Sequence, residues 1–225
     1  MRVLIINPNS SEDVTARIAA AAARVAGPAE VFDAVSAPSD TPLIVTQADA
    51  EHAASAVAEI VGERAADYDG VIIASFGDTG IDRARQITSR PVIGIARSAF
   101  VAALACADSF SIVSFSAAMA PGFETTLKRY GLMNQMRDIV SADIADIEVP
   151  GAMREETEAR ILAACQRVAA EGSPAIVLGG GPLAGLAHRL RGHLSVPVFD
   201  GVEASIAMLR LRLASGSEHG GSSRS

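Results

Sequence analysis

Tryptophan is absent from this 225-residue chain, aromatic residues make up only 4% of it, and cysteine occurs twice, at Cys106 and Cys165. Because aromatic side chains are scarce, Ala, Val, Ile and Leu must form the core that a hydrophobic fraction of 49% can build. Such a core suits buried parallel strands flanked by alanine-rich helices. Two isolated cysteines fit a reducing compartment.

Other absences disfavour whole classes of function. The net charge is −7 and no Lys/Arg run occurs, which argues against nucleic acid as a partner. Lys128 is the single lysine, so Schiff-base chemistry has little support. No apolar run reaches the roughly 18 residues that span a bilayer, and the opening MRVLIINPNS predicts a first strand rather than a signal peptide. We therefore expect a soluble, cytoplasmic protein with no membrane partner.

Segments with strand and helix patterns alternate along the chain. Strands are predicted at 2–6, 30–35, 70–74, 91–95, 109–113, 136–141, 175–178 and 196–199. A helix is predicted at 10–24, where Ser10 and Asp13 form a capping box. Further helices are predicted at 48–66, 81–88, 100–107, 118–130, 155–170 and 202–213, and one more follows the glycine loop 179–182 and ends at 190. The low-complexity tail 215–225 is predicted to be disordered.

Two parts of the chain repeat at a spacing of roughly 105 residues. SRPVIGIARSAFVA at 89–102 parallels SVPVFDGVEASIAM at 195–208, and DGVIIASFGDTG at 69–80 parallels SPAIVLGGGPLAG at 173–185. Chance similarity of buried strand–loop–helix segments is the alternative. The repeat predicts an α/β fold of two pseudo-symmetric lobes, each a parallel-rich sheet flanked by helices, with the active site in the cleft between them. The N-terminal lobe would comprise 1–97 plus 203–214, and the C-terminal lobe 98–202.

Four loops that follow predicted strands can line that cleft. They are rich in small and polar residues, which bring hydroxyls, amides and free backbone N–H groups close to a ligand. The predicted ligand-binding residues are Asn9, Ser10, Ser11, Phe76, Gly77, Ser114, Ser116, Gly180, Gly181 and Pro182. The first loop could equally be a plain turn with a helix cap, and the glycine loop could equally serve strand–helix packing. The glycine loop lacks the Gly-Lys-Ser/Thr ending of a P-loop, so nucleotide binding has weak support.

These loops also carry a resemblance. INPNSS with Thr15, IASFGDTG, PVIGIARSAF, VLGGGPLAG and VPVFDGVEA together resemble the hydantoin and allantoin racemase branch of the aspartate/glutamate/hydantoin racemase superfamily. The match spans nearly the whole chain in the same order and spacing. It implies a two-lobed α/β fold, an active site between the lobes, a small-molecule substrate, no metal, no organic cofactor, and assembly into a homo-oligomer.

Racemases of this family use one cysteine from each lobe as acid and base. By the resemblance, those positions are Ser75 and Gly180 in this chain, and the proline of the first loop is replaced by Thr79. Cys106, in the predicted helix 100–107, and Cys165, in the middle of a helix, lie in no strand-end loop. We interpret both as packing residues.

Without the thiols, other groups have to carry the chemistry. Ser75 is a candidate hydrogen-bond donor or nucleophile, and Asp78 could orient its loop or act as a base. Tyr130 could reach the cleft or make an ordinary structural bond. No His, Asp or Glu residues have the spacing of metal ligands.

Three functional hypotheses follow. The first is a cofactor-independent enzyme that acts on a small hydantoin-like ureide or small carboxylate by non-racemase chemistry, such as ring or amide hydrolysis, decarboxylation, elimination or isomerisation. The second is a racemase or isomerase that uses a non-cysteine base. The third is a non-catalytic ligand-binding protein.

Overall fold

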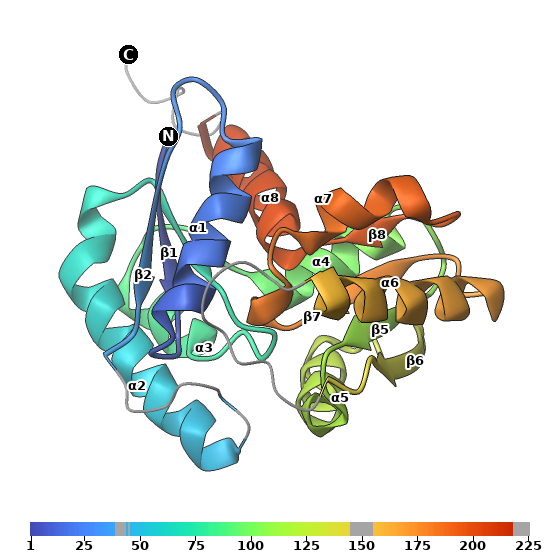
Figure 1. Cartoon of the computed structure of the whole chain (residues 1–225). Helices are drawn as coiled ribbons and strands as arrows, with labels where there is room; N and C mark the ends of the chain where they lie inside the picture. Colours follow the sequence, from blue (N-terminus) through green and yellow to red (C-terminus); the bar gives the residue numbers. More distant parts are fainter. Residues whose placement is uncertain (39–43, 45, 145–154, 218–225) are drawn as a thin grey trace.

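The computed structural model describes residues 1–38, 44, 46–144 and 155–217. Eight strands form two sheets: β1 (Arg2–Asn7), β2 (Val31–Ser36), β3 (Gly70–Ile73) and β4 (Val92–Gly94) in the first, and β5 (Phe110–Ser114), β6 (Met136–Ser141), β7 (Ile176–Gly179) and β8 (Val198–Phe199) in the second. The helices are α1 (Glu12–Val25), α2 (Gln47–Arg64), α3 (Ile81–Ile87), α4 (Ile95–Leu104), α5 (Ala120–Tyr130), α6 (Glu155–Ala170), α7 (Leu186–Leu190) and α8 (Gly201–Ser217). Figure 1 shows the two sheets as separate units with α4 and α8 between them.

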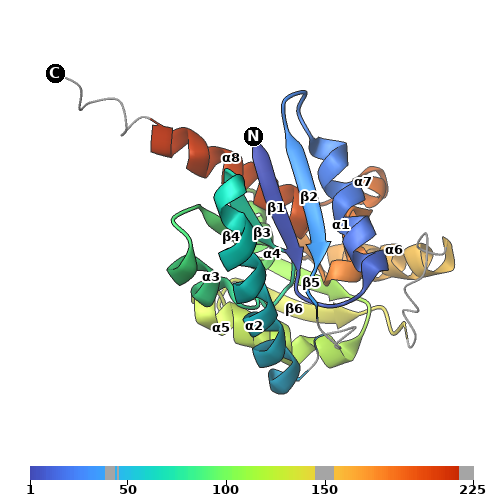
Figure 2. The same cartoon turned by 90° about the vertical axis from the view of Figure 1, so that its left-hand side faces the viewer.

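The two sheets have the same topology. Their strand orders are β2-β1-β3-β4 and β6-β5-β7-β8, and every pairing is parallel. Figure 2 looks onto the first of them. The local backbone repeats as well, because the helices after β3 and β7 both begin at a glycine in the left-handed region, Gly80 at φ 80° and Gly185 at φ 79°. The predicted fold class is thus confirmed.

The inner strands β1, β3, β5 and β7 are buried on both faces, as is typical of parallel sheets, whereas the edge strands β2 and β6 are partly exposed. In β1, Val3 and Ile5 face an inner core, whereas Leu4 and Ile6 face an outer core with α2 and α3. The inner core also takes side chains from both sheets, α1, α4, α5 and α8. A third cluster covers the outer side of the second sheet with α6 and α7. The shared inner core holds the two halves together, so that the carboxyl ends of both sets of strands face each other.

Three details differ from the sequence-based expectations. Ser11, not Ser10, caps α1, because its side chain accepts the hydrogen bond from the Val14 N–H. Helix α4 covers 95–104 instead of 100–107, so Cys106 lies beyond its end and is exposed rather than packed. Helix α8 continues to Ser217, three residues into the predicted tail, and 218–225 lie outside the described residues.

Both sheets lie within the predicted lobes, and α8 packs on α4 and α1. The boundaries at 97/98 and 202/203 stay a prediction. Within the described ranges, no helix has the length and apolar character needed to cross a bilayer.

Candidate active site

A cavity of about 590 Å³, named here the strand-end cavity, opens where the strands of the two sheets end. Its described walls comprise Asn9, Ile44, Thr46, Gln47, Ala50, Glu51, Ala54, Ala74, Ser75, Phe76, Gly77, Thr79, Gly80, Phe115, Met119, Pro121, Gly122, Phe123, Thr125, Thr126, Arg129, Gly180, Gly181 and Pro182. The loops after β3 and β7 are in contact here, since a Cβ placed on Gly181 would lie 3.9 Å from the carbonyl oxygen of Ala74. The structure therefore brings Ser75 and Gly180 to one cavity.

The loop after β3 holds the Ser75 hydroxyl by hydrogen bonds within the loop. Ser75 Oγ accepts a hydrogen bond from the Thr79 N–H at 3.0 Å and donates one to Thr79 Oγ1 at 3.1 Å. A proline at position 79 would have no N–H to donate. The two positions at which the resemblance implies a departure from the family pattern thus contact each other. No base among the described residues hydrogen-bonds to Ser75, which favours a hydrogen-bond donor over a nucleophile, and its predicted catalytic role stays a prediction.

Asp78 is fully buried and binds the start of α4. Its carboxylate accepts hydrogen bonds from the Ala96 N–H at 3.0 Å, the Arg97 N–H at 3.1 Å and the Tyr130 hydroxyl at 2.6 Å. Burial raises the pKa of Asp78, and the bond from Tyr130 opposes that shift. Only glycine fits at position 94, where a Cβ would lie 2.2 Å from the Asp78 carboxyl carbon.

Tyr130 and Asp78 join α5 to the loop after β3 from behind the cavity. Burial, followed by the adjacent Asp78 carboxylate, raises the pKa of Tyr130. Neither residue is among those that line the cavity. Asp78 also has a φ of 45°, a left-handed conformation that aspartate tolerates better than most residues. These contacts favour a positioning role for both residues, and their predicted catalytic roles stay predictions.

The loop after β7 has a conformation that only glycine adopts readily. Gly180 has φ 123° and ψ 139°. A Cβ at this position would lie 2.8 Å from Cε1 of the Phe115 ring. The ring of Phe115 therefore fills the space into which a side chain from position 180 would project, and this wall of the cavity presents an aromatic edge instead of an acid or base.

Both strand-end loops present unpaired backbone donors. The N–H groups of Ser75, Phe76 and Gly77 make no hydrogen bond with another described residue, and the same holds for Gly180 and Gly181. Such N–H groups at turns and helix starts bind carboxylate and oxyanion groups. All five of these residues line the strand-end cavity, so their N–H groups lie around one space.

Asn9 is the predicted residue of the first loop that lines the cavity. Its Oδ1 accepts hydrogen bonds from Asn7 Nδ2 at 2.8 Å and from the Ser11 N–H at 2.9 Å. Because Oδ1 is engaged, the Asn9 side chain is held in one orientation. Its Nδ2 makes no hydrogen bond with the described residues and is available to a ligand.

Four predicted serines lie outside the cavity walls. Ser11 caps α1, Ser114 Oγ donates to the Gly179 carbonyl at 2.8 Å, and Ser116 Oγ accepts from the Ala118 N–H at 3.3 Å. Ser10 does not line the cavity either. The hydroxyls of Ser11, Ser114 and Ser116 bind backbone groups at strand and helix ends, and for Ser11 this was one of the two interpretations of the first loop.

Two walls were not predicted from the sequence. One is the start of α2, where Thr46 and Asp49 form a capping box that fixes the helix end beside the cavity. The other is α5 with Phe115 and Met119 before it. Neither carries a sequence signal of ligand binding, because helix starts and aromatic residues of this kind are common in any core. Phe123 and Phe76 both line the cavity and pack edge to face with ring centroids 5.8 Å apart.

Titratable groups are few at this site. Glu51 and Arg129 are the charged residues among the described walls, and both are ion-paired at its edge, Glu51 with Arg83 and Arg129 with Asp82. Cys106 and Cys165 do not line it. Within the described ranges, no three His, Cys, Asp or Glu side chains gather in a way that could hold a metal ion.

Comparisons with known proteins agree with this geometry. The family model "Asp/Glu/Hydantoin racemase" matches residues 3–209. The hydantoin racemase of Paenarthrobacter aurescens is 32% identical over 219 residues, which cover 96% of this chain and 92% of that protein. The allantoin racemase structure from Klebsiella pneumoniae has a TM-score of 0.88 and 35% identity, covering 96% of this chain and 89% of that one. Arylmalonate decarboxylase, at 17% identity and a TM-score of 0.67, covers 96% of this chain and 93% of its own and shares the fold.

Proposed function

The chain belongs to the Asp/Glu/hydantoin racemase family, and we propose that it is a cofactor-independent enzyme that converts a small hydantoin-like ureide or small carboxylate by chemistry other than racemisation. The observation that carries this proposal is the strand-end cavity itself: Ser75 and Gly180 lie in its walls, and neither cysteine does. Ring or amide hydrolysis, decarboxylation, elimination and isomerisation all fall within the proposal.

The missing acid–base pair argues against two-base racemisation. That reaction needs a proton acceptor on each face of the substrate carbon. On one face, the Phe115 ring occupies the space beside Gly180. On the other, the Ser75 hydroxyl is bound to Thr79 and lacks a partner base among the described residues. A substrate held between them meets no pair of opposed bases.

The donors that remain suit an anionic intermediate. Unpaired N–H groups from both loops, together with Asn9 Nδ2, can bind the oxygen atoms of an enolate or tetrahedral oxyanion. Ser75 then acts as a hydrogen-bond or proton donor. Decarboxylation fits this set of groups best, because departure of carbon dioxide leaves the electron pair on the substrate and asks no protein base to remove a proton.

Asp78 and Tyr130 belong to this proposal as residues that act through the loop after β3. The hydrogen bonds from Ala96, Arg97 and Tyr130 to Asp78 keep that loop against α4. A cytoplasmic location and assembly into a homo-oligomer are further parts of the proposal, supported by the family resemblance.

A racemase or isomerase with a different base is the second candidate. Its support is the similarity to hydantoin and allantoin racemases over nearly the whole chain. A ligand-binding protein without catalysis is the third, supported by the intact cavity without its thiols.

Proton NMR in deuterium oxide distinguishes the three. The full chain is incubated with both enantiomers of 5-substituted hydantoins, with allantoin and with substituted malonates, and each compound is also tested by thermal shift. A new product, such as a decarboxylated or ring-opened compound, that is reduced in Ser75→Ala and unchanged in Cys106→Ser supports the proposal. Deuterium exchange or loss of optical activity without another product supports the second candidate. Stabilisation by a compound that is never turned over supports the third.

A further inference from the structure

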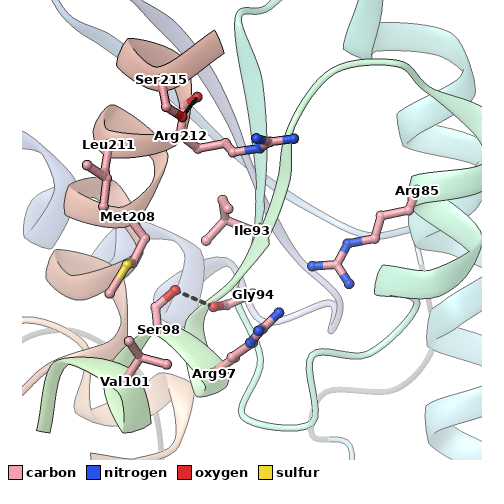
Figure 3. A pocket seen from close by; sticks show the side chains of 10 residues that line it. All are labelled: Arg85, Ile93, Gly94, Arg97, Ser98, Val101, Met208, Leu211, Arg212 and Ser215. Atoms are coloured by element: carbon pink, nitrogen blue, oxygen red, sulfur yellow. Dashed lines mark hydrogen bonds between the residues drawn. The ribbon is translucent and has the colours of Figure 1, made fainter. Parts of the chain in front are cut away.

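A second, smaller cavity of about 330 Å³ lies away from the strand-end cavity and shares no described residue with it. It is formed by α3, the edge strand β4 and the helices α4 and α8 (Figure 3). Its volume is within the range of small-ligand sites. The two cavities are separated by Asp78, whose carboxylate accepts the Arg97 N–H while its neighbour Thr79 lines the larger cavity.

Three arginines line this smaller cavity, and no described acidic residue does. Figure 3 shows the guanidinium groups of Arg85, Arg97 and Arg212 directed toward the same space. None of the three forms an ion pair with a described carboxylate, in contrast to Arg129 and Arg210, which do. Among the described residues, Arg85 donates to the Val92 carbonyl at 3.2 Å, and Arg97 lies over the Tyr130 ring at 5.6 Å from its centroid.

This concentration of positive charge stands out in a chain of net charge −7. Like charges that share a cavity repel one another unless an anion lies between them. Guanidinium groups offer paired N–H donors whose geometry matches carboxylate and phosphate oxygens. The remaining walls are apolar, with Val101, Met208 and Leu211 from α4 and α8. Leu211 is 66% exposed, although it lies beside the three cations.

We propose that this cavity, named here the three-arginine cavity, binds a small organic anion whose carboxylate or phosphate oxygens contact Arg85, Arg97 and Arg212 and whose apolar body lies on Val101, Met208 and Leu211. The arginines supply charge-assisted hydrogen bonds, and the apolar wall selects an organic body over an inorganic ion. Gly94 lines the cavity with its backbone, and its missing side chain faces the Asp78 carboxylate behind it.

The test is calorimetric titration of the full chain at low salt with four probes: phthalate, phenyl phosphate, inorganic phosphate and neutral benzamide. We expect phthalate or phenyl phosphate to bind, and the better of the two identifies the acid group. Inorganic phosphate should bind at least about tenfold more weakly, because it has no apolar body. Benzamide should not bind measurably, because it has no charge.

Variants locate the site. Arg97→Gln and Arg212→Gln should each weaken binding of the better probe by about tenfold or more, because each removes a charged donor. Arg90→Gln is the matched control: like Arg85, Arg90 is exposed and donates to a backbone carbonyl, that of Ala66 at 2.9 Å, but it does not line the cavity. Leu211→Ser should weaken phenyl phosphate and leave inorganic phosphate unchanged.

Circular dichroism and thermal midpoints verify that each variant folds, so that lost binding is not lost structure. The proposal is overturned if none of the anions binds at millimolar concentration, or if Arg212→Gln binds as tightly as the unsubstituted chain. It is also overturned if light scattering shows an oligomer that Leu211→Asp dissociates while the probes fail to bind, because this surface would then be an interface between copies of the chain.

Discussion

Ser75 Oγ lies 3.0 Å from the backbone nitrogen of Thr79 and 3.1 Å from its Oγ1. Ser75 and Thr79, which by the resemblance correspond to a cysteine and a proline of the family, therefore form one hydrogen-bonded unit. A proline at 79 would remove both donor and acceptor, and a thiol at 75 would bind them more weakly. Serine at 75 and threonine at 79 therefore make physical sense together, because each holds the hydroxyl of the other in place.

A double-mutant cycle measures this relationship. Thr79→Val removes the Oγ1 acceptor and keeps the N–H, whereas Ser75→Ala removes both bonds. We expect Ser75→Ala to lower the free energy of unfolding by about 1–2 kcal/mol and Thr79→Val by less, with a coupling of about 0.5–1 kcal/mol between them. Urea unfolding checks these values. Additive effects would show that the hydroxyl–hydroxyl bond contributes nothing.

Restoring a side chain at position 180 should be costly. Gly180→Cys places a Cβ 2.8 Å from the Phe115 ring and imposes φ 123° on a non-glycine residue. We expect a loss of about 2–4 kcal/mol in unfolding free energy. In a double-mutant cycle, Gly180→Cys should cost less in the Phe115→Ala background than in the unsubstituted chain, because the clash with the ring is then absent. Gly122→Ala is the control, because it sits in α5 and a Cβ placed there has no neighbour within 4 Å. An unchanged thermal midpoint for Gly180→Cys would contradict this account.

The fold could be predicted because both of its main features can be recognised from short stretches of sequence. The alternation of short apolar runs with helical segments gives parallel sheets whose inner strands are buried on two faces, and the repeat of about 105 residues gives two copies. Gly80 and Gly185, 105 positions apart, adopt nearly the same left-handed φ. Sequence similarity here reflects a backbone requirement that each half has to meet.

The site could be predicted only as far as the strand-end loops. Small loop residues such as Gly180 and Gly181 indicate a close backbone approach, and both line the cavity. The roles of Asp78 and Phe115 could not be derived, since they depend on contacts with α4 and with Gly180 that arise only after folding. Ser11, Ser114 and Ser116 were predicted to bind the ligand, and in the structure their hydroxyls bind backbone groups at helix and strand ends, so that their contact with a ligand stays a prediction.

The two thiols should differ sharply in reactivity. Cys106 is exposed, whereas burial raises the pKa of Cys165 to about 12. The thiolate is the reactive form, so Cys165 should resist alkylation. We expect N-ethylmaleimide to label one site in the native chain, none in native Cys106→Ser, and both sites in urea, as read by mass spectrometry. Any turnover should survive native labelling, because neither cysteine lines the strand-end cavity.

Removing the Tyr130 hydroxyl should weaken the attachment of the loop after β3. Tyr130→Phe deletes the 2.6 Å bond to the buried Asp78 carboxylate. We expect a loss of about 1–3 kcal/mol in unfolding free energy, and a further rise in the pKa of Asp78. Asp78→Asn, which cannot ionise, provides the comparison. If Asp78 only positions the loop, both variants keep the pH profile of turnover, whereas a shifted or lost acidic limb in Asp78→Asn assigns it a direct role in proton transfer.

The ion pair between Glu30 and Arg210 should make the packing of α8 sensitive to acid. Arg210 binds both carboxylate oxygens of Glu30 and also donates to the Val25 carbonyl at 2.7 Å, which fastens α8 to the turn before β2. Hydrogen bonding to Arg210 lowers the pKa of Glu30 from 4.5 to about 2. Since the folded-state pKa is below the unfolded one, the stabilisation is fully present above about pH 4.5 and is lost as the pH falls toward 2.

Glu30→Gln should therefore lower the unfolding free energy at pH 7 by about 0.5–1 kcal/mol, a modest value because the pair is partly exposed. Urea unfolding at pH 7, 5, 4 and 3 should show this difference shrinking below pH 4.5. The exposed Glu59→Gln serves as the control for loss of charge. A difference that is the same at pH 3 and pH 7 would mean that the Arg210 bond does not depend on the charge of Glu30.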